Sequence, residues 1–308
     1  MTGIVKLNKV TKVIKNRTII DSISFEVHKG EVFGFLGPNG AGKTTTIRMM
    51  VGLIGISEGD IEIAGKSITN DFEQAVSHIG AIIENPEMYK FLTGYQNLLH
   101  YARMSNGINK KKIFEIVELV GLTERIHDKV KTYSLGMRQR LGLAQCLLHE
   151  PDVLILDEPT NGLDPAGIRE IRDHLRYLAK EKNMAVIVSS HLLLEMEMMC
   201  DRIAIIQHGK LIDVQRVQNF LEGSDHVVVF ETADSVKAIQ VISGSYPTIH
   251  IKQLENEIHL LISKEQIPGI VRLLVENHID IFRVQEVTKT LEDRFLEITR
   301  EKADRIHV

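Results

Sequence analysis

An eight-residue run near the N-terminus restricts the fold of this 308-residue chain more than any other feature. Residues 37–44 read Gly-Pro-Asn-Gly-Ala-Gly-Lys-Thr and match the pattern G-x-x-x-x-G-K-[ST] in full. The run follows a short apolar segment at 31–36 that is typical of a strand, and it precedes a helical segment at 44–50. A strand, a glycine-rich turn and a helix are the context that this pattern requires. The sequence therefore predicts a phosphate-binding loop in an α/β fold.

Each residue type in this loop suits the binding of phosphate. Gly37, Gly40 and Gly42 allow backbone N–H groups to close around phosphate oxygens, and the following helix presents its positive end to the anion. Lys43 would place a positive charge at the β- and γ-phosphates, and the Thr44 hydroxyl would bind Mg²⁺. The other predicted nucleotide-binding residues of this segment are Pro38, Asn39, Ala41 and Thr45. The loop by itself identifies an NTPase or a kinase.

Two acidic residues follow a second apolar run. Residues 153–156 read Val-Leu-Ile-Leu and lead directly into Asp157 and Glu158. Ligands bind at the carboxyl ends of strands in open α/β sheets. We expect Asp157 to hold Mg²⁺, directly or through water, and Glu158 to act as the general base on the attacking water. A strand that ends in two solvated acids would look similar, but the loop upstream favours the catalytic interpretation.

Three later segments narrow the class of enzyme. Residues 133–139 read Tyr-Ser-Leu-Gly-Met-Arg-Gln and precede an amphipathic helix for which Ser134 is a natural N-cap. The N-terminus of that helix would attract a second anion, which need not be the one held by the chain's own loop. Residues 161–164 read Asn-Gly-Leu-Asp, and His191 follows an expected strand at 185–188, where a histidine can contact a γ-phosphate. Each segment alone is also compatible with an ordinary capped helix, turn or structural histidine.

Together and in this order, the motifs resemble the ABC ATPase family across about residues 2–220. The matched residues are Ser134 and Gly136 in the signature, Asp157 and Glu158 in Walker B, Asp164 in the D-loop and His191 as the switch histidine. The resemblance implies an α/β P-loop ABC ATPase domain with a parallel-sheet core, an antiparallel β subdomain and a helical subdomain. It implies ATP and Mg²⁺ as cofactors, with Lys43, Glu158 and His191 as catalytic residues. It also implies a head-to-tail dimer, in which each ATP lies between one subunit's phosphate loop and the signature of the second copy.

Two positions depart from the family's pattern. Ile14 stands where an aromatic residue usually stacks on adenine, and it offers apolar contact without a π face. We place Ile14 in the nucleotide site and leave open whether adenine or guanine is preferred. Glu84 stands where a glutamine usually begins the loop that meets the membrane partner. Because a carboxylate binds Mg²⁺ but cannot donate as an amide does, we predict that Glu84 contacts the metal.

Glu84, the run at 79–89 and the C-terminal tail resemble one subset of the family: the ATP-binding subunits of exporters for bacitracin-like and lantibiotic peptides. Ion exporters and other drug exporters have similar cassettes and are alternatives. The resemblance implies a separate membrane-spanning permease subunit and a peripheral location on the cytoplasmic face of the membrane. No apolar run reaches the roughly 18–20 residues needed to cross a bilayer.

An ABC ATPase without a membrane partner is a further, weaker alternative. The net charge of −4 gives no basic footprint for nucleic acid. Ribosome-acting relatives carry two cassettes, and DNA-acting relatives have a long coiled coil between loop and signature. Only 91 positions (134 − 43) separate Lys43 from Ser134, and no sustained heptads fill that interval. A GTPase would need an Asn-Lys-x-Asp run, which the sequence lacks. We therefore expect no nucleic-acid partner.

A change in composition after about residue 222 predicts two domains, 1–222 and 223–308. The expected elements of the second are strands at 226–230, 248–253, 257–262 and 281–287, and helices at 235–242 and 266–277. Their order, β-α-β-β-α-β, is the ferredoxin-like α+β pattern. A last helix is expected at 291–300. Cys146 and Cys200 are too few for a disulfide framework and are predicted to be core residues.

Overall fold

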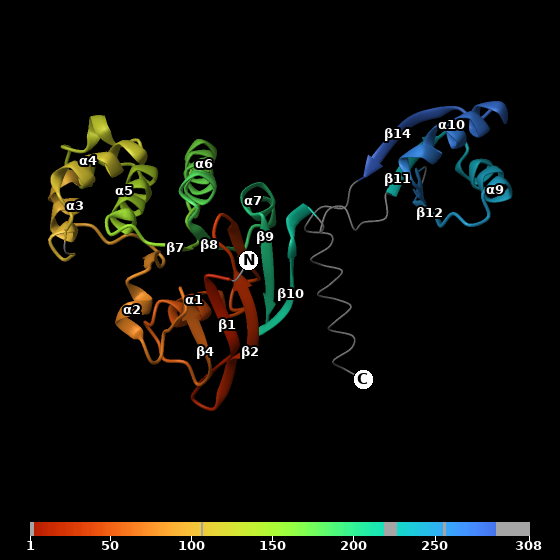
Figure 1. Cartoon of the computed structure of the whole chain (residues 1–308). Helices are drawn as coiled ribbons and strands as arrows, with labels where there is room; N and C mark the ends of the chain where they lie inside the picture. The colour runs from red at the N-terminus through yellow and green to blue at the C-terminus, as the bar shows by residue number, and fades with distance from the viewer. Residues whose placement is uncertain (1–2, 106, 219–226, 255–256, 288–308) are drawn as a thin grey trace. The chain divides into compact units, whose positions relative to one another are not determined.

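The computed structural model describes residues 3–105, 107–218, 227–254 and 257–287. The chain separates into two compact units, Met1–Val217 and Gln218–Val308, and each is described by itself (Figure 1). The predicted domain boundary between residues 222 and 223 lies outside the described residues. Among the helices that the structure describes, none is both long enough and apolar enough to cross a membrane.

The first unit begins with a four-stranded antiparallel sheet in the order β2-β1-β4-β5. Its strands are β1 (Val5–Ile14), β2 (Arg17–Val27), β4 (Glu58–Ile63) and β5 (Lys66–Ser67). Lys15 and Asn16 join β1 to β2, and both have positive φ, 48° and 62°. Two such residues give the turn whose twist matches a tight hairpin. β1 and β2 are therefore joined by a tight hairpin.

A six-stranded sheet forms the centre of the same unit, in the order β10-β9-β3-β8-β7-β6. The strands are β3 (Val32–Leu36), β6 (Ile79–Ile82), β7 (Val153–Asp157), β8 (Ala185–Ser190), β9 (Arg202–Gln207) and β10 (Lys210–Arg216). Only β10 is antiparallel to its neighbour. Every residue of β3, β7 and β8 is buried, as in parallel strands covered on both faces. Because these three strands are adjacent, the residues that follow them meet at one edge of the sheet.

The structure describes seven α-helices in this unit (Figure 1). They are α1 (Lys43–Met50), α2 (Phe72–Val76), α3 (Gly94–Ala102), α4 (Lys110–Leu119), α5 (Leu135–Leu147), α6 (Pro165–Lys182) and α7 (Leu193–Met199). α3, α4 and α5 form a group to one side (Figure 1) and pack together as the helical subdomain, in which Ile113, Ile116 and Val117 of α4 are buried. Cys146 and Cys200 are free and buried, as predicted, and burial raises the pKa of Cys146 to about 12.

In the residues of the second unit that the structure describes, two helices accompany a four-stranded antiparallel sheet. The elements are β11 (Val227–Thr232), α9 (Ser235–Ser245), β12 (Ile251–Leu254), β13 (Glu257–Leu261), α10 (Ile267–Glu276) and β14 (Ile281–Val287). The sheet order β12-β13-β11-β14 and this sequence of elements confirm the ferredoxin-like prediction. β12 begins three residues later than expected, because the Ile249 N–H bonds the Tyr246 carbonyl in a turn. The helix expected at 291–300 lies outside the described residues.

Candidate active site

The glycine-rich loop between β3 and α1 can be built only with glycine at two of its positions. A Cβ atom at Gly37 would come within 2.4 Å of the Ile206 carbonyl oxygen. Gly42 has φ 110°, and a Cβ there would come within 2.4 Å of the Ile20 side chain. Between them Pro38, Asn39 and Gly40 are exposed, while Ala41 is buried. The loop therefore presents its tip to solvent and leads into the unpaired N–H groups that begin α1.

Lys43, the first residue of α1, lies inside this loop. Its ammonium group donates to the Gly37 carbonyl at 2.7 Å and the Pro38 carbonyl at 3.4 Å, and only 5% of the residue is exposed. Nζ lies 3.9 Å from the Glu158 carboxylate. Burial lowers the pKa of Lys43, and the Glu158 and Asp157 carboxylates oppose that shift. The positive charge is therefore held between the loop and the acids that follow β7.

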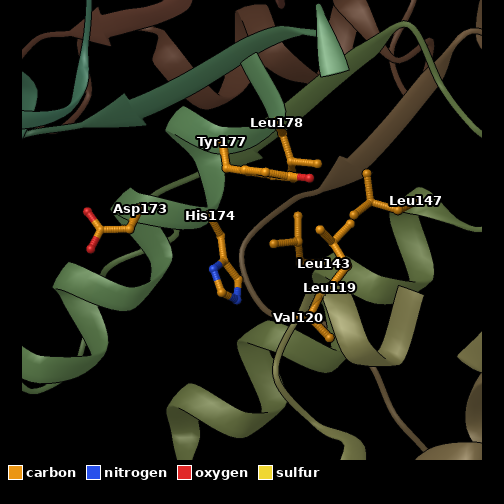
Figure 2. A pocket seen from close by; sticks show the side chains of 8 residues that line it. All are labelled: Leu119, Val120, Leu143, Leu147, Asp173, His174, Tyr177 and Leu178. Carbon is orange, nitrogen blue, oxygen red and sulfur yellow. The ribbon is translucent and has the colours of Figure 1, made fainter. Parts of the chain in front are cut away.

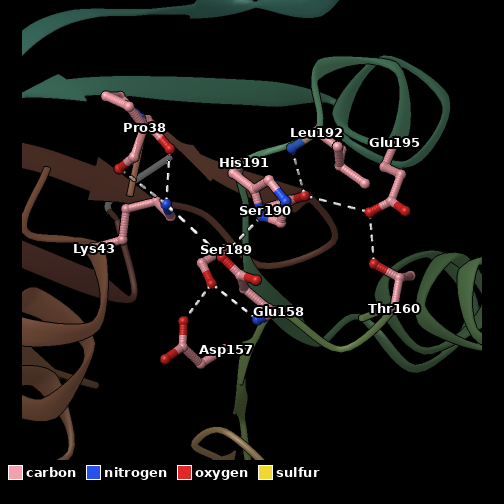
Figure 3. A network of polar contacts seen from close by, with 11 residues as sticks. Pro38, Lys43, Asp157, Glu158, Thr160, Ser189, Ser190, His191, Leu192 and Glu195 are labelled. Atoms are coloured by element: carbon pink, nitrogen blue, oxygen red, sulfur yellow. Dashed lines mark hydrogen bonds and ion pairs between the residues drawn. The ribbon is translucent and has the colours of Figure 1, made fainter. Parts of the chain in front are cut away.

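Asp157 and Glu158 are held by a serine of the neighbouring strand (Figure 3). The Ser189 hydroxyl donates to Asp157 Oδ1 at 2.5 Å and accepts from the Glu158 N–H at 2.9 Å. Asp157 and Ser189 are paired residues at the ends of β7 and β8, and both are buried. Glu158 has φ 49°, a conformation that few residues other than glycine adopt. One hydroxyl thus fixes both the first acid and the backbone of the second.

The Glu158 carboxylate is the point where the predicted catalytic residues meet (Figure 3). His191 Nδ1 lies 3.1 Å from Glu158 Oε1, the same oxygen that is 3.9 Å from Lys43. The Glu158 side chain is 26% exposed and the His191 side chain 38%, so water can reach both. The structure therefore brings Lys43 of α1 together with Glu158 and His191, which follow β7 and β8 more than a hundred positions later in the sequence.

Ser134 and Gly136 begin α5 and are separate from this cluster. Ser134 Oγ accepts from the Met137 N–H at 3.2 Å, which confirms the predicted N-cap. A Cβ on Gly136 would meet nothing closer than 3.9 Å, so the signature presents an open surface. Among the described residues, no hydrogen bond or ion pair joins the signature to the phosphate loop. Asp164 caps α6 by accepting from the Gly167 N–H at 2.8 Å.

Comparisons with known proteins agree with this geometry. The family model described as ABC transporter matches residues 20–161. The chain is 59% identical to the uncharacterized ABC transporter ATP-binding protein YhcH of Bacillus subtilis (strain 168), over 99% of each chain. It is 40% identical to the bacitracin transport ATP-binding protein BcrA of Bacillus licheniformis, over 97% of this chain and 98% of that one. The chain belongs to the ABC transporter ATP-binding proteins.

Two further similarities bear on individual parts of this ABC protein. The lantibiotic transport ATP-binding protein SrtF of Streptococcus pyogenes is 37% identical over 73% of this chain and 98% of its own length. The solved ADP conformation of MJ1267, an ATP-binding cassette of an ABC transporter, is 25% identical with a TM-score of 0.64, over 72% of this chain and 96% of that chain. The fold is therefore that of an ABC cassette, and the enzyme is an ATPase that binds ATP.

Thr44 and Asp157 offer oxygen ligands of the kind that Mg²⁺ prefers. Within the described residues, the Thr44 hydroxyl makes no side-chain hydrogen bond, and only one Asp157 oxygen has a partner. No group of three or more His, Cys, Asp or Glu side chains able to hold a metal is present in that part of the chain. A site of one carboxylate, one hydroxyl and phosphate oxygens fits Mg²⁺, which is held by few protein ligands.

Glu84 and Ile14, the two departures from the family pattern, are both exposed. Glu84 follows β6 with φ 67°, and its carboxylate lies 2.6 Å from Arg48 Nη2 in the last turn of α1. The two side chains are 63% and 42% exposed. Ile14 ends β1 and is 44% exposed. Metal contact by Glu84 and base contact by Ile14 stay predictions.

Several residues of the site were missed by the sequence reasoning. The sequence predicts a role for His191 but none for Ser189 and Ser190, which directly precede it. Thr160 and Glu195 share a short hydrogen bond, and Arg48 pairs with the unusual Glu84. One feature of the sequence could have indicated Glu195: it is an acidic residue on the side of α7 that packs apolar residues.

A cavity of about 260 Å³ lies elsewhere, between the end of α4, α5 and α6 (Figure 2). Leucines and Val120 form its walls, and the Nε2 atom of His174 is buried without a hydrogen-bond partner among the described residues. None of the predicted site residues lines it. It is therefore separate from the phosphate loop and the Walker B acids.

Proposed function

We propose that this protein is the ATP-hydrolysing subunit of an exporter that protects cells from bacitracin-like antimicrobial peptides. One observation carries the proposal: the similarity to the bacitracin relative BcrA extends over 97% of this chain and 98% of that one, and so includes the second unit. The match to the lantibiotic relative SrtF takes in nearly all of SrtF but only 73% of this chain. The presence of the second unit therefore favours a bacitracin-like cargo over a lantibiotic.

The geometry supports hydrolysis at the Glu158 carboxylate. Glu158 accepts a proton from water as that water attacks the γ-phosphorus; the bond to the bridging oxygen breaks, and ADP and phosphate leave. Lys43 and His191, at 3.9 Å and 3.1 Å from the carboxylate, are placed to stabilise the negative charge on the transferred phosphoryl group. Mg²⁺ held by Thr44 and Asp157 would supply further charge neutralisation at the β- and γ-phosphate oxygens. Ser189 keeps Asp157 in place for that role.

We propose that the active unit is a head-to-tail dimer of two copies. Ser134 and Gly136 lie exposed or half-buried at the open end of α5, and nothing in their own chain's phosphate loop bonds to them. Leu135 packs beside Gly162 of the D-loop, so signature and D-loop form one surface. A second copy's bound ATP would complete its site against the N-terminus of α5, where free N–H groups favour an anion.

We also propose that the segment after Glu84 contacts a separate permease at the cytoplasmic face of the membrane. Tyr89 and Phe91 are 45% and 68% exposed, with ring centroids 5.8 Å apart. The buried Asn97 side chain bonds both the N–H and the carbonyl of Tyr89. The two aromatic rings are thus presented to solvent on a fixed backbone, and adjacent exposed aromatics are typical of protein interfaces.

Deletion of the gene tests the cargo. We expect sensitivity to bacitracin to rise, and to be restored by the native gene but not by the Glu158→Gln variant. A lantibiotic tested in parallel separates the two peptide classes. Unchanged sensitivity to both peptides would exclude peptide export and leave an ion or another drug as the cargo. The prediction that the purified chain hydrolyses ATP does not depend on that outcome.

A further inference from the structure

Glu195 on α7 is a buried carboxylate beside the catalytic residues, and no role follows for it from the hydrolysis described above. Only 8% of the residue is exposed. Its Oε2 atom accepts from the Thr160 hydroxyl at 2.6 Å and from the Ser190 hydroxyl at 3.3 Å (Figure 3). Thr160 and Ser190 are themselves 5% and 3% exposed. A carboxylate shielded from water binds hydroxyl donors strongly, because hydrogen bonds to an ionised acceptor are stronger and little water competes for them.

The two hydroxyl donors belong to the two segments that carry the predicted chemistry. Thr160 lies two residues after Glu158, in the turn closed by the bond from the Asn161 N–H to the Glu158 carbonyl. Ser190 directly precedes His191. Glu195 therefore ties the segment of the base to the segment of the histidine; Glu158 and His191 are 33 residues apart in the chain.

We propose that Glu195 is a positioning residue for hydrolysis, which holds Glu158 and His191 at their mutual spacing through Thr160 and Ser190. The proposal rests on the roles proposed above for Glu158 and His191. Glu158 has a positive φ, and such a conformation persists only where its surroundings fix it. Ser189 fixes the backbone N–H of Glu158, and the bond from Thr160 to Glu195 fixes the chain on its other side.

The test uses Thr160, because valine has the shape of threonine without the hydroxyl. In the full-length chain, Thr160→Val is expected to lower kcat for ATP roughly tenfold or more, as for loss of a hydrogen bond to a charged group, with KM within about twofold of native. Thr160→Ser keeps the hydroxyl and is expected to restore most of the rate. Glu195→Gln keeps an acceptor without the charge and should fall between them. Glu197→Gln, two residues along the same helix, is the matched control and should behave as native.

A purely structural role predicts a different pattern. It would lower the melting temperature, lower kcat and raise KM, and its effect would add to that of removing the base. If Glu195 acts through Glu158, Thr160→Val should cost little further rate in a Glu158→Gln background. Equal losses in Thr160→Val and Thr160→Ser, or full additivity with Glu158→Gln, would overturn the proposal. Should Glu158→Gln itself keep normal turnover, the base assignment fails separately, and the comparison of Thr160→Val with Thr160→Ser alone decides whether the hydroxyl matters.

Discussion

Two places at one edge of the six-stranded sheet hold their residues in different ways. The first place is the ends of β7 and β8, and the second is the residue that follows β6. Asp157, Ser189 and Ser190 at the first place are buried; Ser189 donates to Asp157 on the neighbouring strand, and Ser190 donates to Glu195 on α7. Glu84 at the second place is 63% exposed and is held by a single ion pair to Arg48. We call these two places the catalytic corner and the lid position.

We expect this difference to separate the residues that act in hydrolysis from a residue that couples hydrolysis to the permease. Groups that stabilise a transition state must be in place before the reaction, because reorganising them during it costs rate. A residue that reports nucleotide state to a partner must instead exchange between contacts, since a ligand shifts an equilibrium only by its differential affinity for two states. Substitutions in the catalytic corner should therefore have large effects on the isolated chain, and substitutions at the lid position small ones.

The largest effect is expected for Glu158→Gln, which keeps the size of the side chain and removes the proton acceptor. ATP hydrolysis should fall by a factor of roughly 10² to 10⁴, while ATP binding is retained. The ATP-bound dimer should then accumulate, which size-exclusion chromatography with ATP would detect. Near-normal phosphate release from this variant would mean that another group acts as the base.

Ser189→Ala is expected to have the next largest effect. It removes the hydroxyl that donates to buried Asp157 and that accepts from the Glu158 N–H. Hydrogen bonds to charged groups are worth about 1.5–3 kcal/mol, or roughly 10- to 150-fold in rate if all of the bond is realised in the transition state. Because Asp157 is the proposed metal ligand, the Mg²⁺ concentration needed for half-maximal activity should rise. An unchanged Mg²⁺ requirement would show that Asp157 is held well enough by its strand.

The sequence predicted the catalytic corner's main residues because each lies in a contiguous motif next to a strand end. It predicted the order of strands and helices in the second unit because hydrophobic periodicity is a local property. The bonds from Thr160 to Glu195 and from Arg48 to Glu84 span 35 and 36 residues. Such pairs are created by the fold, and no spacing rule in the sequence points to them.

Ile14→Tyr tests whether base recognition belongs with the catalytic corner or with the exposed periphery. Ile14 is 44% exposed at the end of β1, so the aromatic ring of a tyrosine fits there without displacing the core. If the side chain contacts the base, tyrosine should tighten ATP binding by up to about 1.5 kcal/mol, roughly tenfold, through stacking. A titration with ATP and GTP would measure this, with Val13→Tyr on the preceding, also exposed residue as the control. Equal affinities in the native protein and both variants would place the base elsewhere.

The smallest effect is expected at the lid position itself. Exposed ion pairs contribute about 0–1 kcal/mol, so Glu84→Gln or Arg48→Gln should change the stability of the isolated chain little. Basal ATPase should stay close to native, because no contact joins Glu84 to Lys43, Asp157 or Glu158 among the described residues. ATPase stimulated by the permease should fall, by up to about fivefold for a 1 kcal/mol change in coupling.

The same coupling should weaken with added salt in the native complex and much less in Glu84→Gln, because charges at the surface are screened over about 8 Å at physiological ionic strength. Equal salt dependence in the two complexes would show that the carboxylate has no part in coupling, and that the lid position differs from the catalytic corner only in exposure.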